Sequence, residues 1–188
     1  EQSINAIEEF VDRYENIGIA AFNYTTFCMN EMQHPFFYNV HAYSAMLIDS
    51  YMPHRWRLKY NEDVDLCLQV LDSGLCTVLF NAFLVDKTST AAKMKGGNQT
   101  DLYKGNSFEK KLLKAKSLEE MWPQYVRTVV KFGRPHHDIK WKTFFKHPLI
   151  RRKDIDWDNL KPKEFGMKLK KVGMIQNKQL DKFYKDNK

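Results

Sequence analysis

The segment from residue 61 to residue 83 constrains the fold most, because a helical pattern is followed at once by a strand pattern. Gly74 stands where a helix would end, and four apolar residues lie before it at positions i, i+3, i+4 and i+7: Val64, Cys67, Leu68 and Leu71. Residues 76–83 (CTVLFNAF) form a short apolar run that is typical of a buried strand. We therefore expect a helix over about residues 63–73 and a strand packed beside it.

Other segments extend this alternation of helices and strands. Ser3 can cap a helix that runs to about residue 14, and residues 17–24 (IGIAAFNY) and 42–48 (AYSAMLI) are typical of buried strands. Residues 107–116 and 117–130 predict two further helices before an irregular, basic remainder. This order predicts an α/β fold in which the three strands share one sheet and the apolar stripe of the 63–73 helix packs on it.

Composition supports one globular core in a reducing compartment. The chain has 188 residues, of which 43% are hydrophobic and 14% aromatic. It contains no run of ~20 apolar residues that could span a membrane, and its first residues lack the basic and apolar blocks of a signal peptide. Three cysteines, an odd number without metal-ligand spacing, suit the cytosol: Cys28, Cys67 and Cys76.

Charge is divided unevenly along the chain. Residues 1–92 hold 5 Lys/Arg and 12 Asp/Glu, whereas residues 93–188 hold 25 Lys/Arg and 11 Asp/Glu. Aromatic residues are interleaved with the lysines of the second half, which is typical of surfaces that neutralise phosphates and stack on bases. A solvated basic surface over an aromatic core would give the same composition, so both interpretations stay open here.

Three carboxylates lie together where the 63–73 helix is expected to begin. Glu62, Asp63 and Asp65 fall within four residues. The partial positive charge of a helix start stabilises an anion by ~0.3–1 kcal/mol, which explains one or two of them as caps. A third carboxylate adds repulsion unless the group is hydrated or acts together. This position, after a loop that leaves a strand, is also where α/β proteins place their sites.

Six short motifs resemble those of one enzyme family. They are residues 22–24 (FNY), 53–57 (PHRWR), 60–63 (YNED), 79–84 (LFNAFL), 94–98 (MKGGN) and 133–137 (GRPHH). Together they are similar to the TET/JBP-associated glycosyltransferases, found in bacteriophages and linked to sugar modification of hydroxymethylated pyrimidines in DNA. The resemblance covers about residues 1–150 and implies the acceptor-side half of a GT-A fold, a Rossmann-like sheet with flanking helices.

The resemblance implies an inverting transfer of a sugar from a nucleotide-sugar donor. Asp63 is the expected general base for the acceptor hydroxyl, and Glu62 is the second catalytic carboxylate, with an exchange of roles between them left open. His136 or His137 is expected to bind the divalent metal, Mn or Mg, that accompanies the donor. The residues expected to bind substrate are Arg55, Trp56, Arg57, Asp65, Lys95, Gly96, Gly97, Asn98 and Arg134.

Some of these residues have purely structural alternatives. Adjacent histidines point in different directions, the Lys-Gly-Gly-Asn loop can be a simple turn, and Trp56 can pack on the sheet. A metal-dependent nuclease could use the same three carboxylates with Lys59, although nucleases usually spread such ligands over strands. A non-catalytic DNA-binding module would need only the basic half.

The resemblance also sets expectations for the rest of the protein. A GT-A enzyme binds its donor on an N-terminal half that ends in an Asp-x-Asp metal motif, and this chain opens on a helix expected just after that motif. We expect a preceding segment or a second chain to complete the donor site. Residues 1–150 are predicted to form the glycosyltransferase domain and residues 151–188 a basic extension. DNA and a nucleotide sugar are the expected partners, with no membrane, in the cytoplasm of an infected bacterial cell.

Overall fold

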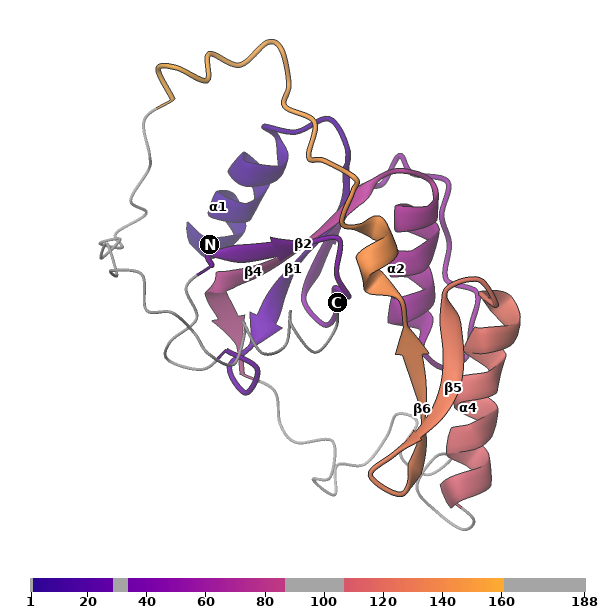
Figure 1. Ribbon diagram of the computed structural model, residues 1–188. Coiled ribbons are helices and arrows are strands. Elements are labelled where there is room, and N and C mark those ends of the chain that lie inside the picture. Colours follow the sequence, from indigo (N-terminus) through magenta and orange to yellow (C-terminus); the bar gives the residue numbers. More distant parts are fainter. Residues whose placement is uncertain (1, 29–33, 87–106, 161–188) are drawn as a thin grey trace.

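A mixed four-stranded sheet lies at the centre of the protein. The computed structural model describes residues 2–28, 34–86 and 107–160 (Figure 1). The strand order is β2-β4-β1-β3, with β1 (Ile17–Tyr24) parallel to β4 (Cys76–Val85) in the middle. The edge strands β2 (Phe36–Tyr38) and β3 (Met46–Ile48) run antiparallel to them. The prediction that three strands share one sheet is confirmed, although the second is shorter than expected and β2 was not predicted.

Helices cover both faces of this sheet (Figure 1). Helix α1 (Gln2–Val11) places Ile7 against Val78 and Phe80 on one face. Helix α2 (Glu62–Asp72) covers the other face. Gly18 allows β1 to approach α2 closely, since a Cβ at that position would lie 2.9 Å from Val70 Cγ1.

Helix α2 is buried on two sides rather than one. Leu66, Cys67 and Val70 pack on the sheet beside Ile19 and Leu79. The remaining apolar residues of the stripe face a second core formed with Leu118, Trp122, Val126 and Phe144; they are Val64, Leu68 and Leu71. The prediction that the whole stripe packs on the sheet is therefore wrong for these three residues, because a second layer covers them.

This second layer consists of one helix and a β-hairpin beside α2 (Figure 1). Helix α4 (Ser107–Met121) is continuous where two helices were predicted, and Pro123 follows its end. Strands β5 (Val126–Lys131) and β6 (Arg134–Ile139) form an antiparallel pair. The part of the predicted 117–130 helix that follows residue 121 is wrong, as is the irregular assignment of residues 134–139, because the β-branched run of β5 pairs with β6.

The chain then returns to the sheet. Asn39 Nδ2 donates hydrogen bonds to the carbonyls of Phe144, in the 3-10 helix η1 (Trp141–Phe144), and of His147, both at 2.8 Å. Residue 151 bridges to Tyr14 after α1. The predicted domain boundary at residue 150 stays a prediction, and residues 161–188 lie outside the described part.

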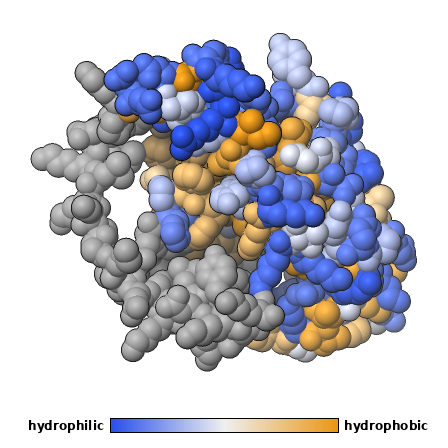
Figure 2. Space-filling model, turned by 45° about the horizontal axis from the view of Figure 1, so that its top comes forward, coloured by the Kyte–Doolittle hydropathy of each residue, from blue (hydrophilic) through white to orange (hydrophobic). Residues whose placement is uncertain are grey.

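These elements confirm the α/β class, whereas the GT-A topology remains an expectation. Within the described residues, no helix is long and apolar enough to cross a membrane. All three cysteines are free, and Cys67 and Cys76 are buried. Figure 2, with the top of Figure 1 brought forward, shows hydrophobic surface in a central hollow with hydrophilic residues around it.

Candidate active site

A polar network lies in the carboxyl-terminal halves of the parallel strands β1 and β4. Asn23 Nδ2 donates a hydrogen bond to Asn81 Oδ1 (2.8 Å), and Tyr43 Oη donates to Asn23 Oδ1 (2.5 Å). Asn81 Nδ2 in turn donates to the carbonyl of His34 (3.1 Å). Ligands of α/β proteins bind outside this end of parallel strands. Asn23 and Asn81 belong to the family-like motifs, but sequence reasoning gave neither of them a role.

Asp63 lies next to this network at the start of α2. Its Oδ2 is 3.1 Å from His41 Nε2, and its Oδ1 accepts a hydrogen bond from the Val64 N–H at 2.9 Å. Its side chain is 33% exposed, so the carboxylate remains accessible. Burial opposes ionisation of Asp63, but His41, the Val64 N–H and the charge of Lys114 together hold the pKa of Asp63 below its ordinary value.

His41 connects Asp63 to the network. Its ring stacks on Trp141 with 6.0 Å between ring centroids, and it meets Tyr43 edge-on at 5.0 Å. These two contacts fix the imidazole beside the carboxylate. Sequence reasoning missed His41, because a single histidine 22 residues before Asp63 carries no local signal of that contact.

Asp65 has a different role from Asp63. Its side chain is fully buried, and its Oδ1 accepts hydrogen bonds from Arg57 Nη2 (2.6 Å) and Trp122 Nε1 (2.8 Å). Its Oδ2 accepts from Arg57 Nε (3.1 Å) and Gln69 Nε2 (2.9 Å). The Arg57 guanidinium also lies over the Trp122 ring at 5.5 Å. Asp65 and Arg57 thus tie α2 to the second layer, and the expectation that Asp65 contacts substrate conflicts with its burial.

The other predicted site residues lie on the start of α2, on the exposed loop before it, on β6, or in parts of the chain that the structure does not describe. Glu62 is exposed, and Trp56 is 52% exposed. The carbonyl of Arg55 accepts a hydrogen bond from Gln69 Nε2. Gln69 lies six residues after Asp63, which is ~9 Å along the helix. The structure therefore does not bring Arg55 beside Asp63. The loop formed by Lys95, Gly96, Gly97 and Asn98 lies outside the described residues.

Helix α4 and strand β6 form a basic cavity near Asp63. The cavity has a volume of about 190 Å³ and is lined by Lys111, Lys114, Ala115, Arg134, Pro135, His136 and His137. The start of α2 is tied to its wall, because Asn61 Nδ2 donates to the Lys114 carbonyl (3.0 Å). Burial, followed by the charges of Lys114 and His41, lowers the pKa of His137 to about 4, and Asp63 opposes this shift. Arg134, His136 and His137 are thus brought into the surroundings of Asp63.

The residues of this cavity do not fit a divalent cation. Arg134 Nε donates a hydrogen bond to His136 Nε2 (2.9 Å), which occupies that nitrogen's lone pair. The positive charges of Lys111, Lys114 and Arg134 repel a divalent cation, and no carboxylate among the described residues lines the cavity. Across the ranges that the structure describes, no three or more His, Cys, Asp or Glu side chains are grouped to hold a metal. The surroundings of His136 and His137 therefore do not support the metal ligation expected of them.

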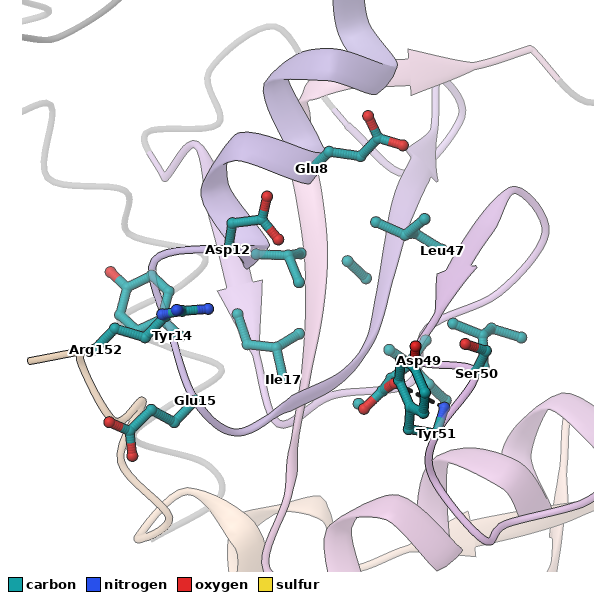
Figure 3. A pocket seen from close by; sticks show the side chains of 15 residues that line it. Glu8, Asp12, Tyr14, Glu15, Ile17, Leu47, Asp49, Ser50, Tyr51 and Arg152 are labelled. Atoms are coloured by element: carbon teal, nitrogen blue, oxygen red, sulfur yellow. Dashed lines mark hydrogen bonds between the residues drawn. The ribbon is translucent and has the colours of Figure 1, made fainter. Parts of the chain in front are cut away.

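A larger cavity of about 630 Å³ lies between α1, β1 and β3 (Figure 3). Glu8, Asp12, Glu15 and Asp49 give it an acidic wall beside Ile17. It is lined by the first residues of β1, at the opposite end of the strand from the Asn23 network. Its size suits a ligand, but its position at the amino end of the parallel strands makes it the weaker candidate.

Comparison with known proteins assigns the family. The sequence profile of the TET-Associated Glycosyltransferase family matches residues 1–97. The chain belongs to this family. This TET-associated glycosyltransferase shows no significant match to a curated protein or to a solved structure. The matched segment contains Asp63, His41 and the Asn23–Asn81 network, whereas the basic cavity of α4 and β6 lies beyond it.

Proposed function

We propose that this glycosyltransferase moves a sugar from a nucleotide-sugar donor to the hydroxymethyl group of a modified pyrimidine in bacteriophage DNA, in the cytoplasm of the infected bacterium. The observation that carries the proposal is the ionised, accessible Asp63 beside His41 at the carboxyl edge of the sheet. It lies within the segment that matches the family. A general base for an acceptor hydroxyl belongs in this position.

Asp63 takes the acceptor proton in the proposed inverting mechanism. The hydroxymethyl oxygen attacks the sugar's anomeric carbon while its proton passes to Asp63, and the bond to the nucleoside diphosphate breaks on the opposite face. Asp63 becomes neutral as it takes the proton, and the leaving nucleoside diphosphate gains one negative charge, so the total charge is unchanged. His41 and the Val64 N–H each contact one oxygen of Asp63, which holds the carboxylate in a single orientation. Each oxygen keeps a second lone pair for the acceptor proton.

The donor and its metal enter the proposal without an assigned site. The described residues hold no group that fits Mn or Mg, so no step of the mechanism is derived through that ion. Residues outside the described ranges, or a second chain, are proposed to bind the nucleotide sugar.

The arrangement of the three carboxylates favours transfer over metal-dependent cleavage. Glu62 is exposed, Asp63 is paired with His41, and Asp65 is buried against Arg57. A nuclease metal site would need these oxygens to converge on one cation. Their different surroundings leave Asp63 as the accessible base, with Glu62 as the second catalytic carboxylate.

The test is sugar transfer to hydroxymethylated duplex DNA by the complete protein with a panel of nucleotide sugars, followed by mass spectrometry of the nucleosides. We expect a hexose-sized or similar mass increase for the wild type and a ~10²-fold or larger loss of turnover for Asp63→Asn. Glu62→Gln is measured beside it, because Glu62 is the second catalytic carboxylate and the alternative base. Full activity of both variants would contradict the proposal, whereas a loss confined to Glu62→Gln would exchange the two roles.

A further inference from the structure

The basic cavity of α4 and β6 is chemically suited to one anion. Lys111, Lys114 and Arg134 line it, and two imidazoles complete the wall. The side chain of His136 is turned toward Arg134, whose Nε donates to it. Guanidinium and ammonium groups that line one cavity are the usual surroundings of a phosphate, and none of the described lining residues is a carboxylate.

The volume of the cavity restricts which phosphate it can hold. About 190 Å³ corresponds to roughly six waters at ~30 Å³ each. Pockets for whole small-molecule ligands are usually ~300–1,000 Å³, so a nucleotide sugar is too large for this cavity. A single phosphodiester group of a nucleic acid fits.

The cavity lies beside the proposed base. Lys114 acts electrostatically on both Asp63 and His137, and its carbonyl accepts the hydrogen bond of Asn61 one residue before α2. An anion bound there would lie close to an acceptor nucleotide at Asp63. Contacts to phosphates fix the register of a protein on DNA.

The hairpin that carries Arg134 and the two histidines ends in an exposed aromatic residue. Phe132 is 95% exposed, and Val130 on the same hairpin is 65% exposed. Phe132 and Gly133 form the two-residue turn with φ of 54° and 69°. Such a turn favours Asn-Gly, so a phenylalanine there is strained, and folding gains nothing from its exposed ring. Arg134 and Lys131 flank the turn, and Lys131 also forms an ion pair with Asp138.

We propose that α4 and the β5–β6 hairpin form the DNA-engaging surface of this enzyme, with one backbone phosphate in the Lys114–Arg134 cavity and Phe132 stacked on a base beside the modified nucleotide. This inference rests on the proposed function, since it supplies the acceptor contacts for the base Asp63. Enzymes that modify a base in duplex DNA take it out of the stack, and apolar side chains inserted between base steps unstack them.

The phosphate contact is tested by the salt dependence of binding to a labelled duplex without any sugar donor. Log affinity should fall with log salt, and losing one phosphate contact reduces the steepness by ~0.9. We expect this reduction for Arg134→Gln and for Lys114→Gln. The slope of the double variant should also be less steep by ~0.9 rather than by twice that amount, because both residues are needed to hold the same phosphate. Lys153→Gln, an exposed lysine in the segment near α1, is the charge-matched control and should leave the slope unchanged.

Different results overturn the two levels of the proposal. Unchanged slopes in Arg134→Gln and Lys114→Gln, with sugar transfer by the wild type intact, would reject this surface and keep the proposed function. Reduced slopes without sugar transfer by the wild type would keep the surface and reject the transfer. Loss of UDP-glucose binding by Arg134→Gln with an unchanged DNA slope would assign the phosphate to the donor and overturn the inference.

Phe132→Ala tests the stacking contact separately. Stacking of one base on an aromatic ring predicts DNA binding about 5- to 150-fold weaker in this variant, with an unchanged salt slope because no phosphate contact is lost. A 2-aminopurine beside the modified base should brighten when wild-type protein unstacks it, and less so with Phe132→Ala. Phe145→Ala, which removes another exposed phenylalanine, is the control. Equal affinity and equal fluorescence for wild type and Phe132→Ala would refute the stacking role.

Discussion

Replacing Asp65 by asparagine should greatly lower the stability of this protein to unfolding, whereas the same change at Asp63 should not. Asp65 is fully buried and accepts four hydrogen bonds, two of them from Arg57. An asparagine keeps the shape but offers one acceptor oxygen. Its amide N–H groups would then face donors, either Arg57 Nε and Gln69 Nε2 or Arg57 Nη2 and Trp122 Nε1.

The size of the effect follows from these contacts. Removing one partner of a buried ion pair costs ~3–5 kcal/mol. The Arg57 side chain is 39% exposed and can regain water, so we expect the lower end, ~3 kcal/mol. Asp63 and His41 are each about one-third exposed, and such a pair contributes only ~0–1 kcal/mol.

Equilibrium unfolding in urea, followed by tryptophan fluorescence, measures both variants. With a denaturant slope of ~2 kcal/mol per molar, Asp65→Asn should lower the midpoint by ~1.5 M, and Asp63→Asn by less than ~0.5 M. Trp122 makes the signal local, because its Nε1–H donates to Asp65. The reasoning fails if Asp65→Asn is as stable as the wild type, or if Asp63→Asn loses equally much.

Three further predictions concern pH, the base and packing. Burial lowers the pKa of His137 to about 4, so the neutral His137 contributes up to ~3 kcal/mol of stability above pH ~6.5, and this contribution is lost as the pH falls toward 4. In His137→Gln the urea midpoint should therefore vary less with pH over that range, and an unchanged pH dependence would contradict this. His41→Gln should shift the acid limb of the kcat/KM profile to higher pH, because the charge of His41 that lowers the pKa of Asp63 is lost while burial remains; an unmoved limb would exclude Asp63 as the titrating base. Gly18→Ala should destabilise by ~1–3 kcal/mol through contact with Val70, and Val70→Ala in the same chain should recover part of that loss in thermal unfolding; a purely additive double variant would show that no such clash exists.

Local pattern was enough to predict the central elements of the fold. The apolar runs of β1 and β4 and the periodic stripe of α2 were located from sequence, because burial on both faces of a sheet leaves a continuous apolar run. The short edge strands bury little, and β2 was missed for that reason. The motifs also sufficed to name the family, because a motif is a local feature of the sequence and most of them lie within the matched residues 1–97.

Only the tertiary structure decided what each carboxylate does. Asp63 and Asp65 lie two residues apart on α2, so they face directions ~200° apart, but the sequence does not say which direction is covered. Trp122, 57 residues later, covers Asp65, whereas His41, 22 residues earlier, reaches Asp63. Contacts over such distances depend on how α4 and the sheet pack on α2, and no local pattern records that packing. For the same reason the sequence determined a charged helix start, while the fold divided it into a buried anchor and an accessible base.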